Sequence, residues 1–362
     1  MGQRQCSLEN MEINTNFWKN RSVFLTGHTG FKGGWLTLWL TMMGAKVHGY
    51  SLDIKTNYDF FKVTNLRDRL STSHIADILN FSNLKSAISS AKPSIIFHMA
   101  AQPLVLESYV SPIKTFETNV IGTVNLLEAC RKIDSVEAIV NITTDKCYEN
   151  KEKLIPYLEN DKLGGFDPYS SSKACSELVT NAYRNSFLKE SGIKIATVRA
   201  GNVVGGGDYA KNRLIPDFFR TVDSGDKLFI RSPNALRPWQ HVLEPLSGYI
   251  LLAEKLIEKG NDFAEAWNFG PEVNDAKTVS WVINYLSLKI SNIKWDIDKS
   301  EQPHEAALLL LDSTKAKERL GWKPQWSLQD ALDKIIEWHK AYKEKKIMGD
   351  ISISQINSYL YE

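Results

Sequence analysis

Short apolar runs alternate with longer amphipathic segments through the first half of the chain. Residues 23–26 form an apolar run that leads into a glycine-rich turn, and beyond it apolar residues recur at helical spacing over residues 35–43. Gly44 stands where such a helix would end, and residues 46–52 give a second apolar strand. The pattern predicts a strand–helix–strand unit of about 30 residues.

Further apolar strands are expected at residues 95–99, 138–142 and 195–198, separated by helix-length segments such as residues 120–132. Alternation of strands and helices is typical of a parallel sheet that helices cover on both faces. The predicted fold class is therefore α/β, with a doubly wound parallel sheet.

The regular alternation of strands and helices ends at about residue 200. Beyond it, a glycine-rich loop at residues 205–208 precedes short elements interrupted by prolines. We expect a first domain at residues 17–200 and a smaller lobe at residues 201–350, with some chain returning to the first domain. Residues 1 to about 16 read as a polar, mobile lead-in, and the last 20 residues as a solvated helix and tail.

Composition and charge fit an ordinary globular protein and give no sign of a polyelectrolyte partner. The chain has 44 Lys+Arg against 42 Asp+Glu, a formal charge of +2, and 43% hydrophobic residues. Its four cysteines are scattered without metal-ligand spacing, so we expect reduced thiols and no metal site. The N-terminus lacks the apolar core of a secretory signal, and the apolar stretch at residues 31–45 is too short to span a membrane. We expect a cytoplasmic protein that binds neither nucleic acid nor membranes.

Residues 27–33 spell G-x-x-G-x-x-G between a predicted strand and a predicted helix, the context that raises such a pattern above chance. Gly27 would allow the tight turn, Gly30 the close approach of a pyrophosphate, and Gly33 the close packing of helix on sheet. The alternative is a glycine-rich turn without a ligand. Asp53 lies 20 residues past Gly33, where a carboxylate would accept hydrogen bonds from a ribose 2′-hydroxyl, and this favours NAD over NADP.

Tyr169 and Lys173 are four residues apart on a predicted helix, so they share one face of it. A cation beside a phenol stabilises the phenolate, which lowers the pKa of the phenol from about 10 toward the range where it accepts a proton from a hydroxyl. The alternative is a surface pair on an exposed helix. The glycine turn upstream favours the catalytic interpretation.

Hydroxyls and charges follow the strand predicted at residues 138–142. Residues 143–148 read Thr-Thr-Asp-Lys-Cys-Tyr, at the edge of a parallel sheet where ligands bind in open α/β folds. A polar turn would explain the same residues, and Asp145 and Lys146 could simply pair with each other. The pattern indicates a ligand-binding edge and leaves the role of either residue open.

The glycine turn and the Y-x-x-x-K pair, in this order, resemble the signatures of the extended short-chain dehydrogenase/reductase family. Within that family the chain closely resembles the CDP-glucose 4,6-dehydratases, over about residues 17–345. The resemblance implies an N-terminal Rossmann domain that holds NAD, a C-terminal lobe that holds a sugar nucleotide, and a homodimer built through paired helices. The blocks that carry it are residues 26–35 (TGHTGFKGGW), 98–105 (HMAAQPLV), 141–148 (NITTDKCY), 167–173 (DPYSSSK), 199–208 (RAGNVVGGGD), 237–248 (RPWQHVLEPLSG) and 266–271 (AWNFGP).

The resemblance also implies a reaction, the loss of water from a nucleotide-linked hexose. Tyr169, assisted by Lys173 and Thr144, would take the C4 hydroxyl proton as hydride passes from C4 to NAD. The resulting 4-ketone acidifies the C5 proton, so a base can remove it while an acid protonates the departing C6 hydroxyl, and hydride then returns to C6. Asp145 is the candidate acid and Lys146 the candidate base, because the CDP-glucose branch carries Asp-Lys here where the dTDP-glucose enzymes carry Asp-Glu. A lysine base needs a pKa lowered by burial or by nearby positive charge.

For the substrate nucleotide the resemblance suggests Asn202, Arg213, Arg237 and His304. A guanidinium suits a diphosphate through forked hydrogen bonds, although Arg237 could equally serve a structural ion pair. For the cofactor the resemblance suggests the turn, the ends of the following strands and the catalytic pair, namely Gly27, Gly30, Phe31, Gly33, Asp53, Asp77, Ile78, Ala100, Ala101, Gln102, Asn119, Tyr169 and Lys173.

Three positions depart from the pattern of these dehydratases. Leu106 and Glu107 stand where they usually carry Arg-Leu, and Ala307 replaces a histidine. The loss of a cation near an anionic ligand would weaken phosphate binding or alter which nucleotide sugar fits. From the resemblance as a whole we expect conversion of CDP-glucose to CDP-4-keto-6-deoxyglucose for lipopolysaccharide O-antigen. We also consider two alternatives. One is an epimerase or ketoreductase, which would not need residues 145 and 146, and the other is a non-enzymatic NAD-binding scaffold.

Overall fold

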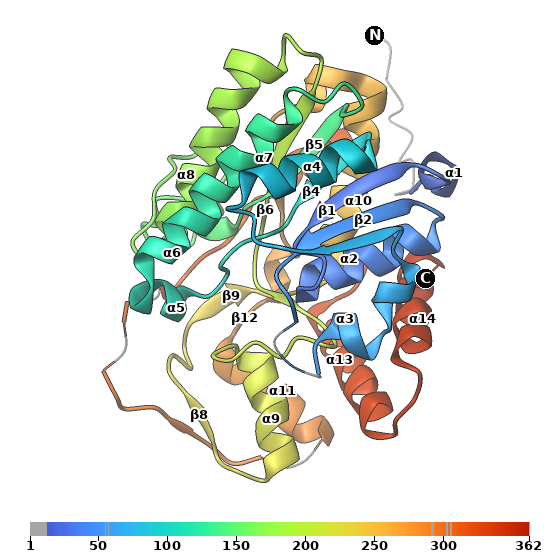
Figure 1. Cartoon of the computed structure of the whole chain (residues 1–362). Coiled ribbons are helices and arrows are strands. Elements are labelled where there is room, and N and C mark those ends of the chain that lie inside the picture. The colour runs from blue at the N-terminus through green and yellow to red at the C-terminus, as the bar shows by residue number, and fades with distance from the viewer. Residues whose placement is uncertain are drawn as a thin grey trace, which may run out of the picture.

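A sheet of seven parallel strands forms the centre of the molecule (Figure 1). Its order is β11-β6-β5-β4-β1-β2-β3, and every neighbouring pair is parallel. The structure, a computed structural model, describes residues 13–54, 56, 58–290, 293–301, 303–304 and 306–361. The strands are β1 (Ser22–Thr26), β2 (Lys46–Ser51), β3 (Thr72–Ile75), β4 (Ile95–His98), β5 (Ala138–Ile142), β6 (Lys194–Ala200) and β11 (Ala266–Phe269).

Helices cover both faces of this sheet. Successive side chains of a strand point to opposite faces, and in the central strands the side chains on both faces are buried under helices. In β1, Val23 and Leu25 pack into the cluster that contains α2 and α10, whereas Phe24 packs into the cluster that contains α4 and α7. This arrangement confirms the doubly wound α/β fold predicted from the sequence. The covering helices are α2 (Phe31–Met42) and α10 (Leu243–Lys259) on one face, and α4 (Phe81–Ala91), α7 (Gly122–Cys130) and α8 (Pro168–Tyr183) on the other.

A separate hydrophobic cluster, formed beyond residue 200, joins β8 to three helices at the lower end of the molecule in Figure 1. The chain between them returns to the main sheet through α10 and β11. We keep as a proposal the division into a domain at residues 17–200 and a lobe at residues 201–350. The cluster's elements are α9 (Leu214–Ser224), β8 (Leu228–Ile230), α11 (Val279–Ile290) and α13 (Leu328–Lys343).

Short elements complete the described chain. A π-helical turn, η2 (Glu117–Ile121), precedes α7, so the α-helix predicted from residue 120 begins two residues later. Three two-stranded sheets pair β10 with β7, β12 with β9 and β13 with β8. The remaining elements are α3 (Phe60–Val63), η1 (Leu66–Arg69), α5 (Val105–Val110), α6 (Pro112–Phe116), η3 (Asp145–Cys147), η4 (Arg184–Leu188), β7 (Val203–Val204), β9 (Leu236–Pro238), β10 (Gln240–His241), η5 (Gly260–Phe263), η6 (Val273–Asp275), β12 (Ala276–Thr278), β13 (Trp295–Ile297) and α12 (Thr314–Leu320).

The C-terminal segment differs from its prediction as a solvated helix and tail, whereas the predicted N-terminal lead-in is described only at residues 13–16, of which 14–16 are exposed. Residues 1–12 of the predicted lead-in lie outside the described residues, but α1 (Thr15–Trp18) follows them and buries Trp18 completely. The last helix, α14 (Met348–Tyr361), is packed and not solvated, since the Tyr359 side chain is 2% exposed and its hydroxyl donates to Glu244 at 2.8 Å. The polar residues between its apolar positions concealed this buried face.

The strand order reverses between β1 and β4, which are neighbours in the sheet although β2 and β3 lie between them in the chain. In open α/β sheets, ligands bind in the crevice outside the carboxyl ends of the strands at such a point. The fold therefore directs attention to the residues that follow β1, β4 and β5.

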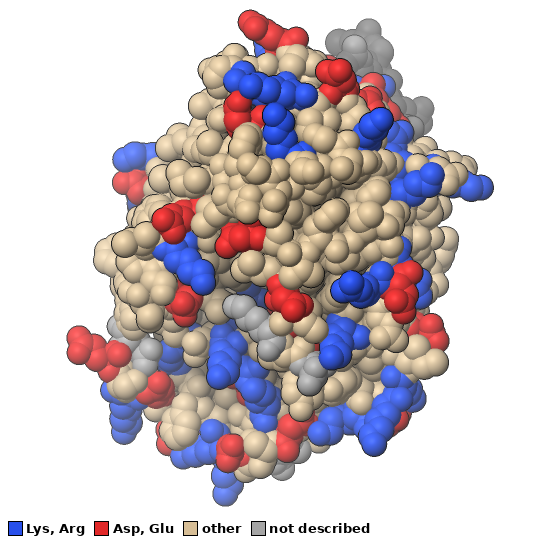
Figure 2. All heavy atoms as spheres, in the orientation of Figure 1, with Lys and Arg blue, Asp and Glu red and all other residues tan. Residues whose placement is uncertain are grey.

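Lys and Arg side chains are interspersed with Asp and Glu over the face shown in Figure 2. None of the described helices is long and apolar enough to cross a membrane. The three cysteines within the described residues, Cys130, Cys147 and Cys175, are free thiols, while Cys6 lies outside those residues.

Candidate active site

The glycine turn after β1 has the geometry that a bound pyrophosphate requires. Gly27 has a φ of +78°, which an L side chain rarely adopts. A Cβ at Gly33 would lie 2.1 Å from the Gly27 carbonyl oxygen, so only glycine allows this approach of helix to turn. Gly30 caps α2 without a side-chain hydrogen bond, and Phe31 begins the helix. The first-turn N–H groups of α2 therefore face a cradle that fits the phosphates of a dinucleotide.

The carboxylates predicted for the cofactor follow neighbouring strands. Asp53 is exposed just beyond β2, and Asp77 is exposed just beyond β3. Ile78 is buried, and its side chain packs so closely on Gly122 that a Cβ there would lie 2.8 Å from it. Asp53, Asp77 and Ile78 thus follow the carboxyl ends of β2 and β3, at the same edge of the sheet as the glycine turn after β1.

The residues after β4 are held in place by Asn119. Its side-chain oxygen accepts the backbone N–H of Gln102 at 2.8 Å, and its amide donates to the Gln102 carbonyl at 3.1 Å and to Ser172 at 2.9 Å. Ala100 and Ala101, partly buried, lie immediately before this clamp. Asn119 therefore fixes the predicted nicotinamide side of the site to α8, which carries Ser172.

Tyr169 and Lys173 lie one turn apart on α8 and are both buried. The helix starts at Asp167, whose side chain accepts the Ser170 N–H at 2.9 Å, with Pro168 in its first turn. The Lys173 ammonium donates to the Ile142 carbonyl at 2.9 Å, at the end of β5. Helix α8 thus presents the pair to the edge of the sheet where β5 ends.

The protonation energetics of this pair differ from the sequence-based expectation. Burial raises the pKa of Tyr169 to about 12, even though a hydrogen bond with Thr144 opposes the rise. Burial also lowers the pKa of Lys173 to about 8, while Glu177 opposes that change. Burial therefore has a larger effect on the pKa of the phenol than any of the neighbouring groups that act on it.

Thr144 joins the phenol to a buried acid. Its hydroxyl is hydrogen-bonded to Tyr169 and donates to Asp145 Oδ1 at 3.0 Å. Asp145 is 2% exposed, and its Oδ2 has no partner within the described residues. Burial raises the pKa of Asp145, although the charge of Lys146 opposes the rise. An unpartnered buried carboxyl oxygen next to the phenol fits an acid that meets a substrate group.

Lys146 follows Asp145 in the short helix η3 and is partly buried. No ion pair joins Lys146 to Asp145 in the part of the chain that the structure describes, so simple pairing of the two does not explain them. The Lys146 backbone N–H donates to Thr144 Oγ1 at 3.3 Å, which fixes the turn.

The four predicted substrate residues lie in different settings. Arg237 is 4% exposed, and its charge opposes the rise in the pKa of Asp145. Arg213 acts electrostatically on Tyr169 but pairs with Asp208 at 2.8 Å.

Asn202 is partly buried, and its carbonyl accepts the Gln240 N–H at 3.0 Å. The exposed ring of His304 packs on Phe166 with a centroid distance of 4.2 Å, and the His304 carbonyl accepts the Tyr109 hydroxyl at 3.1 Å. His304 lies among partners that hold its loop to the first domain, and no described contact joins it to Asp145 or Tyr169.

Sequence reasoning missed Lys32, which the structure places in the same cluster. Its ammonium donates to the Tyr249 hydroxyl at 3.2 Å. Burial, followed by the like charges of Lys173 and Arg213, lowers the pKa of Lys32 to about 7, while Asp145 opposes the change. The sequence feature that could have identified Lys32 is its position as the one charged residue in the stretch at residues 31–45.

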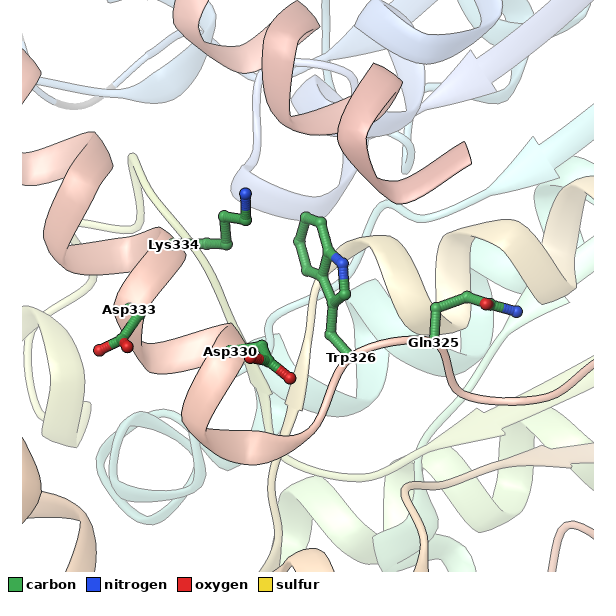
Figure 3. Close-up of a pocket in the computed structure, with 5 residues that line it drawn as sticks. All are labelled: Gln325, Trp326, Asp330, Asp333 and Lys334. Carbon is green, nitrogen blue, oxygen red and sulfur yellow. The ribbon is translucent and has the colours of Figure 1, made fainter. Parts of the chain in front are cut away.

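A cavity of about 390 Å³ beside α13 is a different feature (Figure 3). None of the predicted site residues lines it, and two of its acids already have partners, as Asp330 caps α13 and Asp333 accepts from Tyr285. We do not regard it as the active site. Its lining residues are Gln325, Trp326, Asp330, Asp333 and Lys334.

Comparisons with solved structures show the same fold. The dTDP-glucose 4,6-dehydratase from Bacillus anthracis, solved with NAD, superimposes with a TM-score of 0.74 at 23% identity, over 90% of this chain and 98% of that one. The UDP-glucose 4-epimerase from Thermotoga maritima, solved with UDP-glucose, gives a TM-score of 0.76 at 23% identity, over 89% and 99%. The fold is therefore shared by dehydratases and epimerases and does not separate them.

Comparisons of sequence go further. The CDP-glucose 4,6-dehydratase of Salmonella typhimurium is 50% identical over 354 residues, which cover 96% of this chain and 98% of that protein. The GDP-mannose 4,6 dehydratase 2 of Arabidopsis thaliana is 27% identical, over 91% and 89%. The model of the GDP-mannose 4,6 dehydratase family matches residues 24–335. The match confirms the resemblance to the extended dehydrogenase/reductases, and the chain belongs to the GDP-mannose 4,6-dehydratase family.

Proposed function

We propose that this chain is an NAD-dependent hydro-lyase that converts CDP-glucose to CDP-4-keto-6-deoxyglucose. The observation that carries the proposal is the link through Thr144, which places the buried acid Asp145 beside the phenol of Tyr169. An epimerase or a ketoreductase needs the phenol but has no use for an acid at this position. The 50% identity to the Salmonella enzyme supports CDP-glucose as the substrate.

The cofactor pocket that we propose for NAD combines the glycine turn with the strand ends beside it. Gly27, Gly30 and Gly33 leave room for the pyrophosphate at the start of α2, with Phe31 next to it. Asp53 suits the ribose 2′-hydroxyl and would repel a 2′-phosphate. For the rest of the cofactor we propose Asp77, Ile78, Ala100, Ala101, Gln102 and Asn119.

NAD, when bound, supplies a positive charge, a hydride acceptor for the sugar C4 and a hydride donor for C6. In its phenolate form Tyr169 takes the proton of the C4 hydroxyl, and the Thr144 hydroxyl positions Tyr169 for this transfer. Lys173, whose pKa of about 8 keeps most molecules charged at neutral pH, stabilises the phenolate. These residues together produce the C4 ketone.

The ketone makes the C5 proton acidic, and Lys146 removes it. Asp145, kept protonated in a larger fraction of molecules because burial raises its pKa, gives its proton to the departing C6 oxygen, which leaves as water. The proton on Lys146 then returns to C5 as C6 is reduced. The proton that Tyr169 took from the C4 hydroxyl replaces the one that Asp145 gave up, so both side chains return to their starting forms. The sugar loses one water, and the reaction has no net redox change.

For the sugar nucleotide we propose contacts from Arg213 and Arg237 to the diphosphate, and from Asn202 and His304 to the remainder. Both guanidinium groups act electrostatically on catalytic residues, which supports their place in the site. Glu107 and Ala307, which depart from the pattern of related dehydratases, are exposed. They are the positions at which the substrate range would differ.

We propose a homodimer formed through α6 and α8. Large apolar side chains are exposed on these helices, with Ile113 of α6 at 74% and Leu178 of α8 at 58%, and on the adjoining η2, with Ile121 at 49%. An apolar hollow beside them is lined by Pro112, Phe116 and Val120 among others. We further propose a cytoplasmic location and a role in making 6-deoxyhexoses for lipopolysaccharide O-antigen.

Incubation of the purified chain with CDP-glucose tests the proposed function. We expect a product that is lighter by one water and that shows the absorbance of a 4-ketosugar in alkali. The dTDP-, UDP- and GDP-linked hexoses serve as comparison substrates. A product of unchanged mass would indicate an epimerase, and the absence of product from every nucleotide sugar would favour the NAD-binding scaffold.

A further inference from the structure

A second charged pair lies directly behind the catalytic residues. Glu177 is one turn beyond Lys173 and two turns beyond Tyr169, on the same buried face of α8. Its carboxylate accepts two hydrogen bonds from Arg199 of β6, from Nε and from Nη2, both at 2.9 Å. Glu177 and Arg199 are 4% and 3% exposed, so the pair is isolated from water.

The same carboxylate binds the residue that follows β5 and a residue in the middle of β6. Glu177 accepts the hydroxyl of Thr143, which ends the run from β5, and the hydroxyl of Thr197 in β6. Thr143 directly precedes Thr144 and directly follows Ile142, whose carbonyl accepts the Lys173 ammonium. Helix α8 is thus fastened to two consecutive residues at the end of β5, immediately before the residues proposed to carry out the chemistry.

Arg199 extends the connection to the other side of those residues. Its Nη1 donates to the Tyr148 hydroxyl at 2.8 Å and to the Glu159 carbonyl at 2.9 Å. Tyr148 in turn donates to Asn268 of β11 at 2.7 Å. The pair therefore holds the chain both before and after Asp145 and Lys146.

We propose that Glu177 is a positioning residue for the dehydration: paired with Arg199, it sets the end of β5 against α8, so that Thr144 and Asp145 meet the Tyr169 phenol. This inference rests on the proposed function and extends it. Glu177 touches neither substrate nor cofactor, and it acts through Thr143 and Lys173. A displacement of about 1 Å in such an arrangement lowers a rate by about 100-fold.

Glu177 also has an electrostatic effect that a merely structural residue would lack. Its negative charge raises the pKa of Lys173 against the effect of burial. The other groups that interact with Lys173 are Lys32 from α2, His98 from β4 and Cys147 from η3. Without the negative charge of Glu177, the positive charge of Arg199 would be uncompensated and the pKa of Lys173 would fall further. Lys173 would then lose its proton at a lower pH, so the alkaline limb of the rate profile would move to lower pH.

The test compares two isosteric variants that each remove one threonine bond to the same carboxylate. Thr143→Val frees the end of β5, whereas Thr197→Val frees only a strand that carries no proposed catalytic residue. With CDP-glucose we expect Thr143→Val to lower kcat by about tenfold or more with KM nearly unchanged, and Thr197→Val to stay within about twofold of wild type. Glu177→Gln should lower kcat further and shift its alkaline limb to lower pH, and Glu177→Asp should restore part of that shift.

The outcomes distinguish the two proposals. If wild type is active and the two threonine variants have equal kcat, or Glu177→Gln keeps the wild-type pH profile, the positioning role is wrong while the proposed function stands. If Glu177→Gln does not fold, the threonine pair alone decides the matter. An inert wild type would overturn both proposals.

Discussion

The Asp145 carboxyl and the Tyr169 phenol share one hydrogen-bonding partner, the hydroxyl of Thr144. In the proposed reaction the Asp145 carboxyl gives a proton, whereas Tyr169 takes one and must first be in the phenolate form. Because burial raises the pKa of both groups, each holds its proton more firmly than it would in water. The site is therefore arranged for two proton transfers that occur at different stages of one reaction.

Asp145→Asn should separate oxidation at C4 from the loss of the C6 hydroxyl as water. The amide keeps the size of the side chain but cannot protonate the departing C6 oxygen, so we expect product formation to fall by about 10²–10⁴-fold. Oxidation at C4 should persist, and it is measured as a burst of reduced-nicotinamide absorbance in a single turnover.

The stability of the same variant provides a control. Burial favours the neutral form of Asp145 in the folded state, so its charge contributes a cost at neutral pH that disappears in acid. Asp145→Asn should therefore unfold no earlier than wild type at pH 7. A variant that loses activity together with a lowered Tm would point to misfolding.

Lys146→Ala tests the base at C5. We expect loss of the 4-keto-6-deoxy product by about 10²–10⁴-fold, and loss of deuterium exchange from heavy water into C5. Lys162→Ala is the matched control, since Lys162 is 75% exposed in the segment that follows and pairs with Glu149. Full turnover by Lys146→Ala would refute the assignment.

Lys173→Met should inactivate the enzyme and make the folded chain more stable at pH 7. The folded state lowers the pKa of Lys173 from 10.5 to about 8, so between these values the unfolded chain binds more protons and stability rises with pH. The charge thus carries a cost that is fully present below about pH 8 and is relieved toward pH 10.5.

Removal of that charge should stabilise the protein by about 1–2 kcal/mol at pH 7, after allowance for the lost bond to Ile142. Urea unfolding of both proteins at pH 7 and at pH 10 measures the effect. The difference between them should shrink at the higher pH, and an equal difference at both would contradict the assigned cause.

Gly33→Ala should abolish cofactor retention. The new Cβ would lie 2.1 Å from the Gly27 carbonyl oxygen, so helix α2 must move away from the turn at a cost of about 1–3 kcal/mol. Gly192→Ala introduces comparable strain at a φ of +78° where nothing lies within 4 Å. NAD binding measured by calorimetry should be lost in the first variant and normal in the second.

Leu178→Glu should convert the proposed dimer into a monomer. The charge would enter an apolar contact surface on α8, where burial of an unpaired carboxylate is costly. Leu288→Glu is the control, because Leu288 is 82% exposed on α11 in the other lobe. Light scattering after gel filtration gives the mass, and a monomeric wild type would contradict the proposed dimer.

The sequence was sufficient for the parts of the fold that follow from local pattern. The strand at residues 138–142 was predicted with its bounds, because both of its faces are buried and four of its five side chains are apolar. The buried face of α14 escaped prediction, since Tyr359 and Met348 are separated by polar residues whose partners lie far away in the chain. Strand β3 was also missed, because its residues Thr72–Ile75 are mostly polar.

In the candidate site, too, local sequence predicted the placement of residues on one element but not the properties that depend on the whole fold. The spacing of Tyr169 and Lys173 placed both on one helix, as the structure has them. Their pKa values depend on how much water the whole fold excludes, which no local pattern encodes, and so the spacing of the pair did not indicate that burial raises the pKa of Tyr169. Glu177 and Arg199 were overlooked for a related reason, since they meet only when α8 packs on β6.

The fate of the hydrogen at C4 tests the central claim most directly. CDP-glucose deuterated at C4 should yield a 4-keto-6-deoxy product that carries the deuterium at C6, as read by NMR, because the same hydride leaves and returns within one active site. Deuterium that is lost to solvent, or that is found at C4 of a product which keeps its C6 hydroxyl, would contradict the account.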